Sequence, residues 1–286
     1  MLDDIGARVQ ADFARARSWA FLSDIFGFLS GRPKRLLSYD EVKEKLHIGG
    51  PIHRGLRTVE IARIVGSVNR YADFDRAFLP MHNRIANRWQ NIDRAFYEDI
   101  SLPPVVLYKV GDVYFVVDGH HRVSVARQQG QEFIEAEVRE CHVKVPVGPD
   151  LRPEDLEILG DRVEFLERTG LDRLRPDAVV EVTIPDGYRR ILEHIAVHRY
   201  FMGLEQKRDI ADDEAVVHWY ETVYLPIVRV VRERNILGEF PGRTEGDLYI
   251  WVLDHQHVLH DQGENLSPPD VAAEQYVERL ERSLEL

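Results

Sequence analysis

The sequence predicts an α+β protein with a helical N-terminus, a small mixed sheet in the first half and a mainly α-helical second half. Three observations lead to this prediction. Runs of β-branched and aromatic residues, with one hairpin signal, are concentrated between residues 50 and 145. Apolar residues at helical spacing dominate after residue 150. Stretches rich in glycine and proline divide the chain into a helical arm (1–48), a mixed-sheet domain (49–145) and a helical domain (146–286).

Composition limits the class of protein. The 286 residues carry a formal net charge of −12, and the excess negative charge lies after residue 145. An acidic half argues against general coating of DNA, because phosphate backbones bind concentrated positive charge. Cys141 is the single cysteine, so an intrachain disulfide is excluded and a reducing, cytoplasmic location is the simplest expectation. No apolar run is long enough to span a bilayer, so we expect no membrane partner.

The stretch over residues 113–130 is the most informative part of the chain, and it reads VYFVVDGHHRVSVARQQG. Residues 113–117 form a β-branched and aromatic run that the polar pair Asp118 and Gly119 ends. Apolar residues at helical spacing follow, and Gly130 stands where a left-handed helix cap is expected. The predicted order is therefore strand, glycine turn and helix.

The first helical turn after this strand has the composition of an anion site. The N–H groups of a first turn and the positive end of the helix dipole attract anions. Gly119 allows close approach of the backbone, Arg122 offers a planar donor fork, and His120 and His121 can donate hydrogen bonds or move a proton. In the alternative interpretation the histidines cap the helix, Asp118 is a turn residue, and Arg122 pairs with a neighbouring carboxylate.

A predicted hairpin precedes this turn. Pro103 and Pro104 are followed by an apolar run over 105–110, a tight turn at 111–112 and the strand over 113–117. A hairpin that leads into a glycine-histidine-arginine box and a short helix resembles the ParB/sulfiredoxin superfamily. In this resemblance, residues 57–68 look like the first strand and opening box. A strand over 133–138 is expected to close the small sheet.

The resemblance implies a nucleotide site. In that superfamily the glycine, histidine and arginine of the box contact nucleotide phosphates, and they correspond to Gly119, His121 and Arg122 here. The Asp-Gly-His-His-Arg form looks similar to nucleotide-using members such as the free-serine kinase branch, which directs attention to a carboxylate at Glu60. Sulfinic acid reductase chemistry is not expected, because His120 stands where sulfiredoxin has its catalytic cysteine.

Three functions are compatible with these patterns. The first is binding of ATP, ADP or another nucleotide, with magnesium, by a phosphotransferase or phosphohydrolase that uses Asp118 or Glu60 as base or metal ligand and His120 and His121 as catalytic partners. The second is a ParB-like DNA-binding regulator or nuclease, which the acidic half and the lack of a helix-turn-helix pattern disfavour. The third is a non-catalytic nucleotide sensor.

Arginines interleaved with aromatic residues form a candidate second wall of the nucleotide pocket, and residues 81–97 among them have helical periodicity. Arginine beside an aromatic ring suits stacking on a base and pairing with phosphate. In the alternative interpretation these arginines pair with aspartates of the same segment. The arginines are Arg70, which we assign to phosphate binding, Arg76, Arg84, Arg88 and Arg94, and the aspartates are Asp73, Asp75, Asp93 and Asp99.

The segment over residues 2–29 has the pattern of an amphipathic helix. Its apolar side carries Phe13, Trp19 and Phe26. This aromatic content suggests contact between copies of the chain, and packing of the helix on its own domain is the alternative. Ser38 with Glu41 predicts a capped short helix next in the chain.

The second half consists of predicted helices, with a β-like run over 178–184 as the exception. We expect Pro226 to kink a helix over 215–234, and Thr244 with Asp247 to begin another helix. Scattered histidines on helices are most often core or interface residues, so we assign no metal site to them. These histidines are His194, His198, His218, His255, His257 and His260.

Overall fold

The computed structural model describes residues 2–30, 36–69, 72–262 and 265–284. The chain forms two compact units, Met1–Glu157 and Ile158–Leu286. The first unit combines helices with a six-stranded mixed sheet, and the second is helical. The prediction of a mixed protein with a helical N-terminus, a sheet in the first half and a helical second half is therefore confirmed. The N-terminal helix belongs to the first unit.

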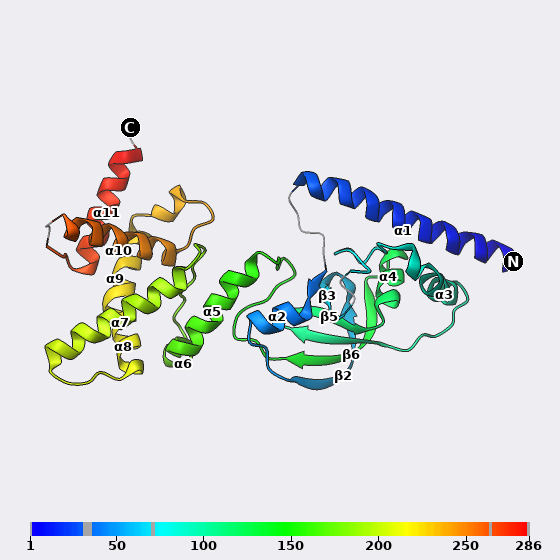
Figure 1. Cartoon of the computed structure of the whole chain (residues 1–286), viewed down its shortest axis with the longest axis horizontal. Coiled ribbons are helices and arrows are strands. Elements are labelled where there is room, and N and C mark those ends of the chain that lie inside the picture. Colours follow the sequence, from blue (N-terminus) through cyan, green and yellow to red (C-terminus); the bar gives the residue numbers. More distant parts are fainter. Residues whose placement is uncertain (1, 31–35, 70–71, 263–264, 285–286) are drawn as a thin grey trace. The chain divides into compact units, whose positions relative to one another are not determined.

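The first unit contains short and long helices around the sheet (Figure 1). Its helices and helical turns are α1 (Leu2–Ser30), α2 (Tyr39–Lys45), η1 (Ile61–Arg63), η2 (Asn83–Ile85), α3 (Ala86–Tyr97) and α4 (His120–Gln128). Its strands are β1 (Leu37–Ser38), β2 (Pro51–Glu60), β3 (Ile64–Ser67), β4 (Val105–Val110), β5 (Val113–Asp118) and β6 (Phe133–Cys141). The unit ends inside α5 (Asp155–Thr169).

The six strands lie in the order β1-β3-β5-β4-β6-β2. β4 and β5 form the predicted antiparallel hairpin, with Val110 opposite Val113. β3 runs parallel to both β1 and β5, so these three strands end at one edge of the sheet. Open sheets of this kind bind ligands at the carboxyl ends of parallel strands, and Asp118 is the last residue of β5.

The strand predicted over 133–138 is present as β6, but the expectation that it closes the sheet is wrong. β6 runs over Phe133–Cys141 and lies between β4 and β2, with which it pairs in parallel and antiparallel fashion, respectively. β2 forms the outer edge, and its long pairing with β6 depends on residues far apart in the sequence. Residues 57–68 comprise the end of β2, the turn η1 and β3.

One face of the sheet is covered by α3 and α4. Val123 and Ala126 of α4 belong to the same buried cluster as Leu107 and Val116 of the sheet and Trp89 of α3. Side chains alternate between the two faces of a strand, so the neighbours of Leu107 and Val116 face the other way. Burial of this apolar cluster therefore holds α4 flat against the centre of the sheet.

The opposite face carries α2. Ser38 caps α2 through its side chain, as predicted. Tyr39 packs against the rings of Tyr108 and Phe115, with centroid distances of 4.7 and 5.6 Å. The hydroxyl of Tyr39 lies 3.3 Å from the buried Sγ of Cys141, and burial raises the pKa of that thiol. The single cysteine is therefore a core residue.

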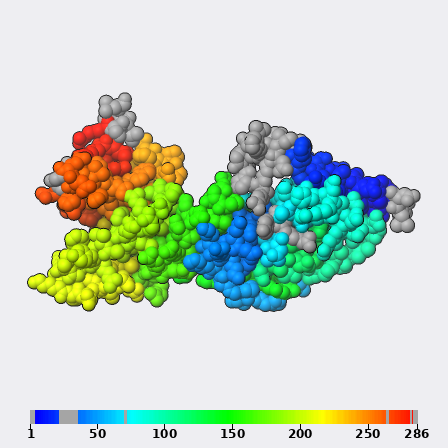
Figure 2. All heavy atoms as spheres, viewed as in Figure 1, coloured from blue at the N-terminus to red at the C-terminus, as the bar shows by residue number. Residues whose placement is uncertain are grey.

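α1 packs on the first unit along one side. Val9 and Phe13 are buried, and the Phe13 ring meets Trp89 of α3 edge-on, with a centroid distance of 5.5 Å. In Figure 2 the blue atoms of α1 lie against the cyan and teal atoms of the segment that contains α3. Trp19 does not belong to this buried side, because 59% of it is exposed, and the side chain of Phe26 lies outside the described residues. Contact between copies of the chain stays a prediction.

The second unit is built from helices that follow α5. They are α6 (Leu171–Leu174), α7 (Gly187–Gln206), α8 (Asp212–Trp219), the π-helical turn η3 (Tyr220–Tyr224), α9 (Leu225–Glu233), η4 (Ile236–Glu239), α10 (Glu245–Asp261) and α11 (Pro269–Leu284). Thr244 and Asp247 form the predicted capping box of α10. Within the described residues, no helix has both the length and the apolar composition that a bilayer span requires.

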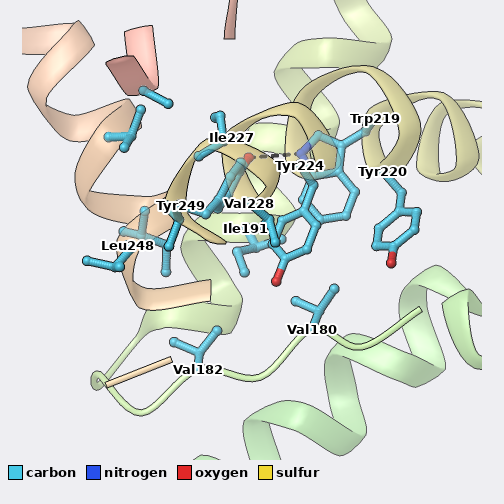
Figure 3. Packing of buried hydrophobic residues seen from close by; sticks show 14 of the residues in the cluster. Val180, Val182, Ile191, Trp219, Tyr220, Tyr224, Ile227, Val228, Leu248 and Tyr249 are labelled. Atoms are coloured by element: carbon cyan, nitrogen blue, oxygen red, sulfur yellow. Dashed lines mark hydrogen bonds between the residues drawn. The ribbon is translucent and has the colours of Figure 1, made fainter. Parts of the chain in front are cut away.

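The prediction of a strand over 178–184 is wrong. Val180 and Val182 are buried in the helical core (Figure 3), and the amide N–H of Thr183 donates to the Asp247 carboxylate at 2.8 Å. Asp247 also accepts the amide N–H of Ile184, at 3.2 Å. The apolar residues of this segment alternate because every second one is buried against helices. The Asp247 side chain accepts the hydrogen bonds that a neighbouring strand would otherwise accept.

Aromatic residues make up the centre of this helical core (Figure 3). Trp219 Nε1 donates to the Tyr249 hydroxyl at 2.9 Å, and that hydroxyl lies 3.2 Å from His194 Nδ1. Burial lowers the pKa of His194 to about 4, so its ring is neutral near pH 7. His194 is therefore a half-buried, neutral residue at the edge of the aromatic core, within hydrogen-bond distance of the Tyr249 hydroxyl.

The helix predicted over 215–234 is interrupted by the π-helical turn η3. Pro226 follows this turn as the second residue of α9, and proline cannot donate a hydrogen bond to the preceding turn. The irregularity expected at Pro226 thus takes the form of a wider helical turn. Within it the rings of Tyr220 and Tyr224 stack, with a centroid distance of 5.5 Å.

A buried polar group joins α1, α3 and the end of α4. Asp93 is fully buried and Asp12 is 7% exposed. Gln129 Nε2 donates to Asp93 Oδ1 at 2.7 Å, and the Tyr97 hydroxyl donates to Asp12 Oδ2 at 2.6 Å. Burial, with a smaller effect from the charge of Asp12, raises the pKa of the Asp93 carboxyl to about 6.

We predict that ionisation of Asp93 destabilises the fold. Because the pKa is higher in the folded state than in the unfolded state, the stabilising contribution is complete below about pH 4 and is lost as the pH rises through about 6. Asp93→Asn cannot ionise, so it should exceed the parent in free energy of unfolding by roughly 2 to 3 kcal/mol at pH 7.5 and by much less at pH 4. Urea unfolding at both pH values measures this difference, with the exposed Asp150→Asn as control. An equal difference at pH 4 and 7.5 would contradict the prediction.

Candidate functional site

The turn after β5 has a geometry that requires glycine. Gly119 has a φ of +97°, and a Cβ at this position would lie 2.5 Å from Val105 Cγ1. The turn therefore brings the start of α4 directly against β4. The predicted order of strand, glycine turn and helix is confirmed, since β5 ends at Asp118 and α4 begins at His120.

Both histidines of the box are buried. His120 and His121 are each 6% exposed. His120 Nε2 lies 2.8 Å from Ser67 Oγ, at the end of β3. Phe74 contacts both imidazoles, with centroid distances of 6.4 Å to His120 and 5.4 Å to His121. The two rings therefore fix the first turn of α4 beside the carboxyl end of β3.

The guanidinium of Arg122 holds the other side of the turn. Nη1 donates to the carbonyl oxygens of Pro103 and Pro104, the latter at 2.9 Å, and Nη2 donates to the Asp118 carboxylate at 2.6 Å. The Arg122 side chain is 14% exposed, whereas that of Asp118 is 61% exposed. The carboxylate pairing that the alternative interpretation predicts is thus present. Nε of Arg122 makes no hydrogen bond with any residue that the structure describes.

Buried polar contacts hold α4 farther along its length. Ser124 Oγ donates to the Phe78 carbonyl at 2.6 Å. Arg127 Nη2 donates to the carbonyl oxygens of Ile61 and Ile64, at 2.8 and 2.7 Å. Burial lowers the pKa of Arg127 to about 10, so the guanidinium keeps its charge near pH 7. These contacts fix the direction in which α4 points.

A cavity of about 330 Å³, which we call the turn cavity, lies at the N-terminus of α4. It is lined by residues 117–122 together with Asn69, Arg88 and Ile92. The cavity lies at the carboxyl ends of β3 and β5, where the positive end of the α4 dipole is directed. Its electrostatics therefore favour an anionic guest.

Among the arginines predicted to form a second wall, Arg88 is the one within the described residues that lines this cavity. Arg88 is exposed and, among the residues that the structure describes, makes no hydrogen bond or ion pair. Arg94 lies on the same helix and is exposed, but it does not line the cavity. Arg70 lies outside the described residues. Asn69 is a wall residue that the sequence analysis missed, since no local pattern distinguishes a loop asparagine.

Two other arginines of that segment make contacts inside the fold. Arg84 Nε donates to Asp73 Oδ1 at 3.2 Å, as the alternative interpretation predicts. Arg76 donates to the carbonyl oxygen of Leu151 at 2.6 Å. These arginines therefore support loops and do not line the turn cavity.

Glu60 lies apart from the turn cavity. It is the last residue of β2, and its carboxylate accepts a hydrogen bond from Arg63 Nε at 3.0 Å. β3 begins soon afterwards, opposite Tyr114 near the start of β5, whereas the cavity lies at the other end of β5. Among the candidate catalytic residues, the structure thus brings residues 118, 120 and 121 together and leaves Glu60 outside.

Histidines of the second unit contact one another and the core. His198 Nε2 on α7 lies 2.8 Å from His218 Nδ1 on α8. Burial and, to a smaller extent, the neighbouring His218 lower the pKa of His198. Within the described part of the chain, no group of three or more histidine, cysteine, aspartate or glutamate side chains is placed to hold a metal ion.

Neither the family models nor the curated proteins searched give a match to this chain. The resemblance to the ParB/sulfiredoxin superfamily therefore stays a prediction from the residues of the box.

We predict that Arg122→Ala lowers the stability of the ligand-free protein. The variant loses the donors to Pro103, Pro104 and Asp118, and we expect the free energy of unfolding to fall by about 2 kcal/mol, the scale of a hydrogen bond that involves a charged group. Arg122→Lys keeps the charge but loses the planar fork, so it should recover only part of this loss. Urea unfolding measures all three proteins, with Arg94→Ala as control. An Arg122→Ala protein as stable as the parent would show that these contacts do not support the turn.

Proposed function

We propose that the chain binds a nucleotide, with its phosphate groups in the turn cavity, and acts as a nucleotide-dependent phosphotransferase or phosphohydrolase. One observation supports this proposal above the others: the first turn of α4 lines a cavity at the carboxyl ends of two parallel strands. A helix N-terminus attracts phosphate through its N–H groups and its dipole. The left-handed turn at Gly119, which packs against Val105, allows α4 to start directly after β5, so that its first N–H groups lie at the cavity.

The charges around the cavity suit a phosphate group. Arg88 supplies an exposed guanidinium from α3, whereas the charge of Arg122 is paired with Asp118 in the same wall. Arg70 follows Asn69, a wall residue, so its assignment to phosphate binding stays part of the proposal. This arrangement supplies the positioning and charge stabilisation on which phosphoryl transfer depends.

Asp118 is the residue to which we assign the chemistry. Its carboxylate lines the cavity and is 61% exposed, so it can hold a magnesium ion or accept the proton of the attacking hydroxyl or water. His120 and His121 are assigned to positioning, because both rings are buried against Phe74. Glu60 has no part in the proposal, because it lies outside the cavity.

We predict that a nucleotide raises the melting temperature of the protein. Arg88→Ala should weaken nucleotide binding roughly tenfold, because the variant loses one charge-assisted hydrogen bond to phosphate. The ligand-free stability should not change, because Arg88 is exposed and contacts no described partner. Thermal shifts and calorimetric titrations with ATP, ADP, CTP and GTP, with and without magnesium, measure both effects.

Arg94→Ala is the matched control, since it removes an exposed arginine of the same helix outside the cavity. This variant should bind nucleotide as the parent does. If both arginine variants weaken binding equally, general charge is responsible and the site is misplaced. If no nucleotide and no inorganic phosphate stabilises the parent, the proposed function is wrong. Release of phosphate that Asp118→Asn abolishes, with binding retained, would establish catalysis.

A further inference from the structure

A second cavity, of about 310 Å³, lies beside Arg122. We call it the apolar cavity. Its wall comes from α3, α4, the loop before β4 and the start of β6, and it includes Ile92, Phe96, Val125 and Phe133. The described residues of this cavity are mostly apolar, in contrast to those of the turn cavity.

The two cavities share a wall. Ile92 and Arg122 line both of them. Nη1 of Arg122 donates to the carbonyl oxygens of Pro103 and Pro104, which belong to the apolar cavity, whereas Nη2 donates to Asp118, which belongs to the turn cavity. A ligand that extends along the Arg122 side chain would therefore reach both cavities.

Each cavity by itself is small for a binding site. Binding sites for small molecules have volumes of about 300 to 1,000 Å³. The turn cavity and the apolar cavity, at about 330 and 310 Å³, are each at the lower limit of this range. A ligand that occupied both cavities past the shared residues Ile92 and Arg122 would fill a volume within this range.

The mouth of the apolar cavity exposes large apolar side chains. Phe133 is 55% exposed, Ile100 is 53% exposed and Phe96 is 37% exposed. Burying these groups under a ligand would remove apolar area from water, which is favourable. Glu135 gives this wall a negative charge, and Gln131 adds an amide that can both donate and accept hydrogen bonds. The cavity therefore suits a neutral, flat group with polar edges and disfavours a second phosphate.

We propose that the apolar cavity binds the base of the nucleotide whose phosphate groups lie in the turn cavity. This inference rests on the proposed function and identifies the part of the substrate that the turn cavity does not hold. A nucleotide carries its anion and its aromatic group at opposite ends of a ribose, as the two cavities require. The base stacks on Phe96 or Phe133, and its polar edge faces Gln131 and Glu135.

The test compares ligands that share a phosphate group and differ in the base. Phe133→Ala and Phe96→Ala should each weaken ADP binding to the full-length protein roughly tenfold, the effect of losing a base–aromatic stack, and leave pyrophosphate binding unchanged. Both rings are partly exposed, so the melting temperature of each ligand-free variant should stay near that of the parent. Calorimetric titration measures the affinities.

Two further variants sharpen the test. Phe21→Ala removes a phenylalanine of α1 that is 64% exposed and lines neither cavity, and it should bind ADP as the parent does. Gln131→Ala should change the order of affinity among ATP, CTP and GTP, because their bases present different edges to the amide. An unchanged order, with ADP binding also unaffected in Phe96→Ala and Phe133→Ala, would overturn the inference.

The outcomes separate this inference from the proposed function. If pyrophosphate binds the parent as tightly as ADP, the base makes no contact and the inference is wrong, while the phosphate site stands. If geranyl diphosphate binds more tightly than ADP, and Phe133→Ala removes that advantage, the apolar cavity holds a hydrocarbon chain and the inference is again wrong. If neither ADP nor pyrophosphate binds, the proposed function fails and the inference fails with it.

Discussion

The position of the turn cavity depends on one half-buried guanidinium. Arg127, near the end of α4, donates to the carbonyl oxygens of Ile61, Ile64 and Arg76, at 2.8, 2.7 and 3.2 Å. It also lies over the ring of Phe78, 5.0 Å from the centroid. A single side chain thus joins α4 to the turn before β3 and to the loop after it. The direction of α4, and with it the place where its positive end acts, follows from these contacts.

Other polar side chains of α4, and Gln129 directly after it, also help to fix the orientation of this helix. Ser124 accepts a hydrogen bond from Trp89 Nε1 at 2.8 Å and donates to the Phe78 carbonyl. Gln129 reaches Asp93 on α3. An apolar helix face alone would tolerate rotation or sliding on the sheet, whereas a buried donor without its acceptor costs free energy. These buried polar contacts therefore fix the orientation of α4, the helix whose first turn faces the turn cavity.

Local sequence patterns were sufficient for the elements that depend on neighbouring residues. The hairpin, the glycine turn and the start of α4 follow from residues 105–122, and the caps at Ser38 and Thr244 follow from residues three positions apart. The walls of the site could not be predicted in this way. Ser67 meets His120 across 53 positions of sequence, a distance over which periodicity carries no information.

The two errors in strand prediction have a common cause. Apolar alternation reports that a segment is half-buried, but it does not say which element buries it. Residues 178–184 alternate because helices cover them and Asp247 satisfies their amides. β6 was expected to close the sheet because its partner β2 is distant in the sequence: Phe133 lies opposite Glu60, 73 positions earlier. For the same reason, the sequence could not separate the arginine that lines the turn cavity, Arg88, from Arg76 and Arg84, which make contacts inside the fold.

The π-helical turn at Tyr220–Tyr224 makes the second unit sensitive to chain length. Such a turn holds one residue more than the α-helical turn that it replaces. Each residue of an α-helix advances the chain by about 100° around the axis. Loss of one residue here would restore regular hydrogen bonding but would rotate α9 relative to α8, which would take Ile227, Val228 and Val231 out of the core that they share with Trp219. Within this segment the number of residues is therefore more tightly constrained than their identity. Neighbouring side chains can repack around an apolar substitution. A single deletion, in contrast, would shift every contact that follows it.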